Sequence, residues 1–217
     1  MDASAQASVR IANVLMPEKG QYLIRCSDGF DAPRGARVVV NLDYGIDVAE
    51  LRDVGTYDPS RDGPHPPGFT LQRLATPEDA IAEARNENRA RVLRDAFRDA
   101  ARKIAPDIRV PYARLSLGGT RLFVRYVCER QRPDFRQVLA DIRKEHGVTV
   151  NAWQMGLRDE VRVIGAMGPC GRACCCATWQ QKYPGGLSPE SFRGQNPAAL
   201  NGTCGRFKCC LAFERGD

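Results

Sequence analysis

The chain has 217 residues, enough for one large domain or two small ones with a core that needs no disulfides. Its net charge of +6, with 27 arginines against 5 lysines, permits RNA contact but supports it weakly, because acidic residues are interspersed throughout. No apolar run is long enough to cross a bilayer and no signal-peptide stretch opens the chain, so we expect a cytoplasmic protein without membrane insertion.

The first predicted region, residues 1–70, is a small β-rich unit. Its apolar segments are short and are separated by turn residues, a pattern typical of strands. These segments are residues 8–16, 21–26, 36–44 and 46–54. Residues 55–70 are rich in proline and glycine, which predicts an irregular loop. His65 lies in this loop between two prolines, and we expect it to be exposed and without chemistry.

The second predicted region, residues 71–164, is a long helix followed by an α+β layer. Thr76 and Pro77 suit a helix start, and an apolar stripe runs on to Ile104. The segments that follow indicate a hairpin, an amphipathic helix and a further strand; they are residues 112–130, 133–147 and 148–155. This order predicts an α+β fold, with an antiparallel sheet that has helices packed on one face.

The arginines of the long helix and two isolated cysteines have ordinary structural interpretations. We expect the arginines at 85, 89, 91, 94, 98 and 102 to form a solvated helix face rather than an RNA-binding surface. Cys26 and Cys128 are in phase with apolar neighbours on their strands, so we expect them to be small buried core residues.

The third predicted region, residues 165–217, contains a duplicated cysteine motif. Residues 168–179 are GPCGRACCCATW and residues 202–213 are GTCGRFKCCLAF, so one pattern of Gly-x-Cys-Gly-Arg-x-x-Cys-Cys recurs after 34 positions. Six thiols repeat in register: Cys170, Cys175, Cys176, Cys204, Cys209 and Cys210. Cys174 has Lys208 at the matching position, so we assign it an accessory role at most. The three regions are expected to pack into one compact body.

Clustered thiols in a cytoplasmic protein indicate metal or redox chemistry more often than disulfides. A shared site could use four thiolates, from Cys170, Cys175, Cys204 and Cys209, to hold zinc or an iron-sulfur cluster. Alternatively, each repeat could give three thiolates to its own cluster, with a partner or exogenous ligand completing it. The simpler interpretation is a zinc knuckle that staples a segment poor in apolar residues. Catalysis by a nucleophilic cysteine is disfavoured, because the only histidines, His65 and His146, lie in no catalytic context.

The glycine and arginine after the first cysteine of each motif are candidates for a supporting role. Gly171 and Gly205 allow a turn with positive φ that directs amide groups toward a thiolate sulfur. Arg172 and Arg206 supply positive charge beside an anionic thiolate site.

Two segments give the chain a family resemblance: QMGLRDEVRVIGAMGPCGRACC and QNPAALNGTCGRFKCCLAFE. They resemble the YaaT/RicT family, whose shared region is called the PSP-one C-terminal domain, and a looser likeness extends over most of the chain. The resemblance implies a cytoplasmic regulator that acts with two small helical proteins, RicA and RicF. It also implies a 4Fe-4S cluster and an influence on RNA processing by the endonuclease RNase Y, with consequences for sporulation.

Carried onto this chain, the resemblance makes the six repeating cysteines cluster ligands and gives no role to Cys174. The spacer between the motifs is shorter than in the family, and Ala199 and Asn201 replace its usual lysine and serine. We therefore expect a non-catalytic adaptor that carries an iron-sulfur cluster. The alternative is a zinc-stapled module that binds nucleic acid.

Overall fold

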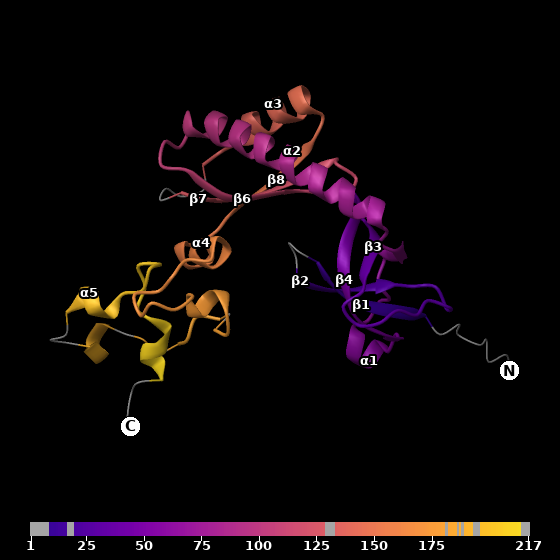
Figure 1. Cartoon of the computed structure of the whole chain (residues 1–217), viewed down its shortest axis with the longest axis horizontal. Coiled ribbons are helices and arrows are strands. Elements are labelled where there is room, and N and C mark those ends of the chain that lie inside the picture. The colour runs from indigo at the N-terminus through magenta and orange to yellow at the C-terminus, as the bar shows by residue number, and fades with distance from the viewer. Residues whose placement is uncertain are drawn as a thin grey trace. The chain divides into compact units, whose positions relative to one another are not determined.

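The computed structural model describes residues 9–16, 20–128, 133–180, 182–185, 187, 189–192 and 196–213 (Figure 1). The chain divides into two compact units. The first consists of residues 1–97, 114–123 and 136–151, and the second of residues 98–113, 124–135 and 152–217. The whole cysteine-rich segment, residues 165–217, therefore belongs to the second unit.

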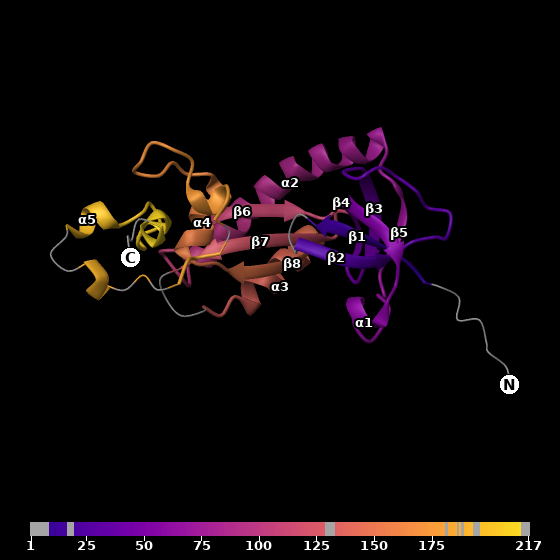
Figure 2. The same ribbon diagram turned by 90° about the horizontal axis from the view of Figure 1, so that it is seen from below.

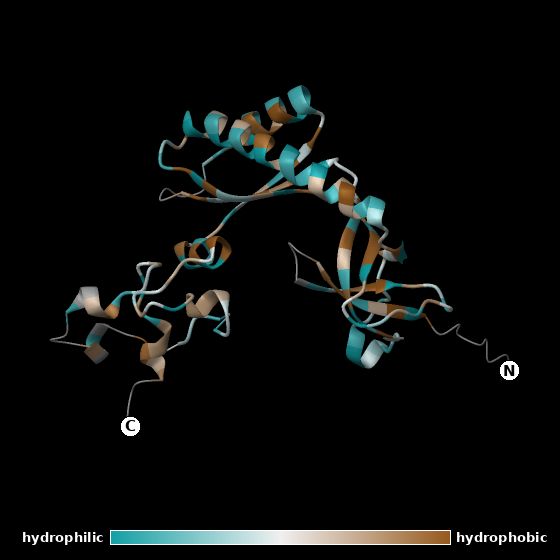
Figure 3. Ribbon diagram, in the orientation of Figure 1, coloured by the Kyte–Doolittle hydropathy of each residue, from teal (hydrophilic) through white to brown (hydrophobic). Residues whose placement is uncertain are grey.

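Five strands of the first unit form a closed barrel in the order β1-β2-β5-β3-β4. They are β1 (Arg10–Met16), β2 (Gly20–Arg25), β3 (Arg37–Leu42), β4 (Gly45–Thr56) and β5 (Thr70–Leu74). Neighbouring strands are antiparallel, except for the short parallel pairing of β2 with β5. Alternate residues such as Val14, Ile24 and Val38 are fully buried in its core. Figure 3 shows hydrophobic residues along β3 and β4.

The four N-terminal strands are confirmed close to their predicted bounds, whereas β5 and the closure of the barrel were not predicted. β5 follows the proline-rich loop and buries only Leu71, so it lacks the alternation of a strand with one buried face. The loop itself contains a single helical turn, α1 (Pro59–Asp62), which begins where the Asp58 carboxylate accepts a hydrogen bond from the Ser60 amide at 2.9 Å. His65 is exposed, as expected.

The long helix and the second sheet agree with the predicted α+β class. Helix α2 (Pro77–Arg102) buries Leu93, Phe97 and Ala101 along one face. Strands β6 (Arg109–Leu115), β7 (Arg121–Val127) and β8 (Thr149–Gln154) form a three-stranded sheet in that order, and α3 (Arg136–His146) lies between β7 and β8 in sequence. Figure 1 shows α2 and α3 on the same face of this sheet.

The prediction that this sheet is wholly antiparallel was wrong. β6 and β7 form the expected hairpin, closed by a hydrogen bond from the Ser116 amide to the Arg121 carbonyl. β8, however, runs parallel to β7. The Thr149 amide donates to the Thr120 carbonyl at 2.9 Å, and the Met155 amide to the Tyr126 carbonyl at 2.8 Å, so both strands advance in the same direction (Figure 2). The reason is that α3 forms a crossover between them, the connection that parallel neighbours require.

The two isolated cysteines differ in burial. Cys128 is buried, as predicted, and its thiol lies 3.4 Å from a carboxylate oxygen of Asp107. Cys26 is only half-buried and packs against the barrel core, where burial raises the pKa of its thiol. Among the residues that the structure describes, no helix is long and apolar enough to cross a membrane.

The remaining elements belong to the second unit and surround the cysteines. They are α4 (Leu157–Ile164), the 3₁₀ turns η1 (Cys175–Ala177), η2 (Pro189–Phe192) and η3 (Cys209–Ala212), and the short helix α5 (Pro197–Leu200). α4 begins after Gly156 and ends before Gly165, whose φ of 70° is the left-handed conformation typical of the residue that caps a helix C-terminus.

The start of α2 predicts a pH dependence of stability. Two hydrogen bonds from Arg73 and one from the Thr76 amide hold the pKa of the Asp79 carboxyl well below its ordinary value of 3.8. The ionised carboxylate therefore stabilises the fold fully above pH 3.8, and this contribution is lost as the pH falls further. We expect Asp79→Asn to lower stability at neutral pH and to flatten its decline below about pH 4.

Urea unfolding across the acid range measures this effect. The matched control is Asp31→Asn in an exposed loop, which should follow the wild-type profile. An unchanged profile for Asp79→Asn would show that the Arg73 interaction adds no stability.

Candidate thiolate site in the cysteine-rich module

The two cysteine motifs fold into the same local structure. Each forms a narrow turn closed by a β-bridge, Met167 with Ala173 in the first and Asn201 with Phe207 in the second. The equivalent hydrogen bonds, from Gly168 to the Arg172 carbonyl and from Gly202 to the Arg206 carbonyl, are both 2.8 Å. A 3₁₀ turn with the vicinal cysteines follows each bridge. The duplicated sequence is therefore a duplicated structural unit.

Glycine is required at the second position of each Cys-Gly step. Gly171 has φ of 74° and Gly205 has φ of 75°, values that other residues rarely adopt. The predicted positive-φ turn is confirmed at both positions.

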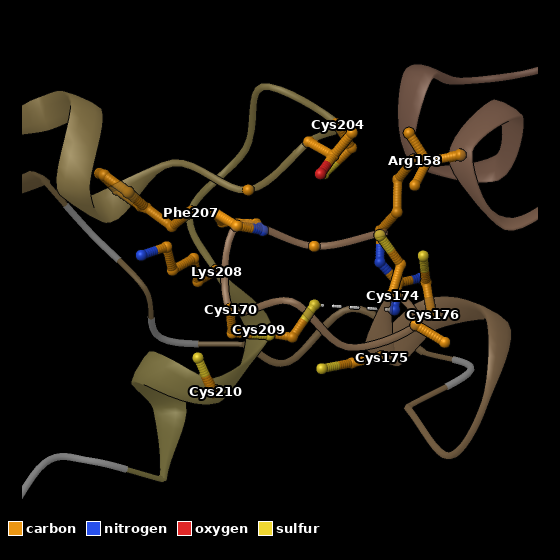
Figure 4. Close-up of a pocket in the computed structure, with 16 residues that line it drawn as sticks. Arg158, Cys170, Cys174, Cys175, Cys176, Cys204, Phe207, Lys208, Cys209 and Cys210 are labelled. Atoms are coloured by element: carbon orange, nitrogen blue, oxygen red, sulfur yellow. Dashed lines mark hydrogen bonds between the residues drawn. The ribbon is translucent and has the colours of Figure 1, made fainter. Parts of the chain in front are cut away.

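Cysteines from both repeats line a single cavity of about 70 Å³ (Figure 4), several times the 10–15 Å³ that one water needs. The thiols around it are Cys170, Cys174, Cys175, Cys176, Cys204, Cys209 and Cys210. The two motifs therefore face a common space. Their role as metal ligands stays a prediction.

Cys174, outside the repeating pattern, is one of the most enclosed of these thiols. It is buried with Cys176 in a cluster around Val161, and Cys204 of the other repeat packs against them. Burial raises the pKa of the Cys176 thiol, which the nearby Arg158 guanidinium only partly offsets. The cavity therefore holds a seventh thiol that the repeat pattern alone did not indicate.

The arginines of the motifs do not line the cavity. Arg172 and Arg206 are exposed, and neither is among the described residues that line the cavity. Arg206 instead lies over the ring of Tyr183, 5.5 Å from its centre. Tyr183 donates its hydroxyl to the Phe207 carbonyl at 3.4 Å, so Arg206 and Tyr183 pack together beside the second repeat.

A third arginine, Arg158, reaches the cavity from α4. It is only 6% exposed, and its Nη2 lies 3.9 Å from the Cys209 sulfur (Figure 4). Sequence reasoning missed it because α4 lies outside the motifs. Sequence signals mark the helix but not the role of this arginine: Gly156 and Gly165 bracket α4, and Asp159 and Glu160 occupy its first turn.

The donor set suits a soft metal or cluster. The described lining of the cavity has thiols and no carboxylate or imidazole, a selection that favours zinc, copper(I) or iron-sulfur centres over magnesium or calcium. Among the described residues, no three Cys, His, Asp or Glu side chains are already arranged to hold one ion.

The aromatic residues that end the motifs occupy equivalent positions and touch each other. The rings of Trp179 and Phe213 lie 5.5 Å apart, and their side chains are 59% and 64% exposed. Contact between matching positions of two repeats is the arrangement expected about a local pseudo-twofold axis.

Comparison with known proteins gives one partial match. Over 93 residues the chain is 29% identical to stage 0 sporulation protein YaaT of Bacillus subtilis (strain 168). The match covers 40% of this chain and 32% of that protein, so the chain spans about a third of its relative's length. No family model matches the chain, and no solved structure matches it significantly. The similarity supports a relationship to YaaT over the matched segment, in agreement with the resemblance of the cysteine motifs.

Proposed function

We propose that this chain is a non-catalytic regulatory protein whose cysteine-rich module binds a 4Fe-4S cluster. The observation that carries the proposal is the single cavity at which thiols of two structurally equivalent motifs meet. Thiolates are the usual ligands of such clusters. The cavity lining that the structure describes offers no oxygen or nitrogen ligand from a carboxylate or histidine.

The ligands would come from the six repeating cysteines, with Gly171 and Gly205 shaping the turns that present them. When bound, the cluster supplies a redox-active, oxygen-sensitive centre. The protein's part is to hold the two turns in register and to limit access of water through burial of Cys174 and Cys176. Cys174, being enclosed in the same cavity, is a reserve ligand within reach of the site.

The absence of catalysis is part of the proposal and has two supports. His65 and His146 both lie in the first compact unit, outside the second unit that holds the thiols. His146 ends α3, where its carbonyl accepts a hydrogen bond from Arg89 at 3.1 Å and its ring nitrogen lies 3.9 Å from the neighbouring Glu145 carboxylate.

The biological role follows from the relative and from the motif resemblance. The matched protein is named for stage 0 of sporulation, and the motifs resemble a family that works with the helical proteins RicA and RicF. We propose that this chain likewise joins small helical partners in a complex that controls RNA processing by an endoribonuclease such as RNase Y. The exposed Trp179–Phe213 pair lies in the same module and is available for partner contact.

Elemental analysis tests the cofactor. Protein purified without oxygen, or reconstituted with iron and sulfide, should contain iron and acid-labile sulfide in near-equal amounts and show charge-transfer absorption in the visible range. Stoichiometric zinc without iron under the same conditions would contradict the cluster and favour a zinc-stapled, nucleic-acid-binding module. A protein that binds neither would contradict the metal site altogether.

A further inference from the structure

Arg158 is an unusual cation because it is almost completely buried among cysteines. Arginine is rarely buried unless a partner compensates its charge, since a guanidinium loses much hydration on leaving water. At 6% exposure, this side chain lines the same cavity as the seven thiols. A charge that is buried to this extent does not serve as a solvated surface group.

The contacts of Arg158 connect three separate segments. Its Nη2 donates to the Gln180 carbonyl, directly after the first motif, and lies 3.9 Å from the Cys209 sulfur in the second motif. Gln180 is itself tied to the first motif, because its amide donates to the Cys175 carbonyl at 2.8 Å. The guanidinium also lies over the Tyr183 ring, 5.6 Å from its centre. One side chain thus links α4 to both repeats.

A soft-metal site built from several thiolates has a net negative charge. The arginines that belong to the motifs are exposed. The described cavity lining has two cations, Arg158 and Lys208, and of these Arg158 is the buried one. A fixed positive charge beside the sulfurs lowers the free energy of a buried anionic centre, and hydrogen bonds to sulfur raise its reduction potential.

We propose that Arg158 is the positioning and charge-compensating residue of the thiolate site, the role that the sequence pattern suggests for Arg172 and Arg206. This inference rests on the proposed metal-binding function. Arg158 acts through the ligands: it holds Cys209 toward the first repeat and balances the negative charge of the bound centre.

Four variants separate charge from structure. Arg158→Lys keeps the positive charge, and Arg158→Gln keeps a hydrogen-bond donor for the Gln180 carbonyl without the charge. Arg158→Met keeps a long side chain but removes both the charge and the donor. Arg162→Met is the matched control, because Arg162 lies one turn along α4, half-exposed, and pairs with Asp159 at 3.7 Å. Circular dichroism of each metal-free protein shows whether it folds.

The readouts are the affinity for zinc, by competition with a chromophoric chelator, and the thiolate-to-cobalt charge-transfer absorption. We expect Arg158→Met and Arg158→Gln to bind zinc at least about tenfold more weakly, the usual effect of losing an outer partner of a metal ligand. The zinc affinity of Arg158→Lys should stay within a few-fold of wild type, and Arg162→Met should bind zinc as tightly as the wild-type protein. The cobalt band should keep its intensity per metal in every variant, because the thiolates themselves are unchanged.

Reconstituted clusters give a second, independent measurement. The midpoint potential of Arg158→Gln should fall by about 59 mV, which is a tenfold change for one electron. The inference is overturned if Arg158→Gln has wild-type zinc affinity and potential, or if it binds as tightly as Arg158→Lys. It also falls if wild-type protein binds neither zinc, cobalt nor a cluster, the outcome that contradicts the proposed function itself. If Arg158→Met does not fold, the comparison of the Lys and Gln variants decides.

Discussion

Replacement of Asp47 by alanine should destabilise the first unit by about 3–5 kcal/mol, the usual cost of removing one partner from a buried ion pair. Asp47 has no exposed surface, and its carboxylate forms an ion pair with both terminal nitrogens of Arg114. It also accepts hydrogen bonds from the Tyr44 hydroxyl at 3.1 Å and the Val48 amide at 2.9 Å. The variant would remove the carboxylate that compensates a guanidinium whose side chain is only 17% exposed.

The same carboxylate connects the barrel to the hairpin of the second sheet, since the Leu117 amide donates to it at 3.3 Å. Burial and the neighbouring Asp47 charge raise the pKa of Tyr44 far above its ordinary range, so its hydroxyl stays a donor. Alanine in place of Asp47 would therefore leave several donors inside the protein without their acceptor.

Denaturant unfolding followed by far-ultraviolet circular dichroism measures the loss. The control is Asp53→Ala, which also lies on β4 but is exposed, and its effect should stay within about 0.5 kcal/mol. Equal stabilities of the two variants would show that the buried ion pair contributes nothing net.

Local sequence patterns predicted most elements of the fold, and a pairing between distant segments explains why β5 was missed. The β1–β4 strands, α2 and α3 follow from alternation, capping residues and apolar periodicity, all of which are local. The pairing of β5 with β3 is different, because Leu71 and Val40 are neighbours only after the chain has closed the barrel. The parallel course of β8 was within reach of the sequence, since a strand, helix and strand in succession is the pattern of a crossover.

The candidate site likewise has a part that local sequence predicts and a part that depends on contacts between distant residues. The Cys-Gly turns were predictable because a positive φ favours glycine. The duplication left open whether the two repeats share one site, and the structure places their thiols around one cavity. Arg158 was not predictable in the same way. Its sequence position, 51 residues before Cys209, gives no sign of the contact that forms between them. The burial of Arg158 depends on residues that surround it only in the folded chain, so the sequence alone does not indicate it.

Replacement of Cys204 by serine should abolish stoichiometric metal binding, with a loss of affinity beyond about 100-fold, because loss of a ligand exceeds the 10–100-fold cost of losing an outer partner. Like Cys170, Cys175 and Cys209, Cys204 is a ligand in both arrangements open to the module, one shared four-thiolate site or three thiolates from each repeat. Its packing against buried residues of the first repeat makes it the most informative of the four. It is half-buried against Cys174 and Cys176 of the first repeat, so its sulfur already lies at the junction of the two motifs.

The measurement is iron, sulfide and zinc content after anaerobic reconstitution, together with circular dichroism of the metal-free protein. Cys26→Ser is the control, because Cys26 is half-buried like Cys204 but packs against the barrel core, and this variant should retain wild-type metal. The Cys204→Ser spectrum should be nearly unchanged, since the barrel and α+β cores do not include this residue. Full metal content in Cys204→Ser would mean that the repeats do not share a site through this thiol. An equal loss of metal in both variants would indicate that the substitutions disturb the folded structure and that no metal ligand was specifically removed.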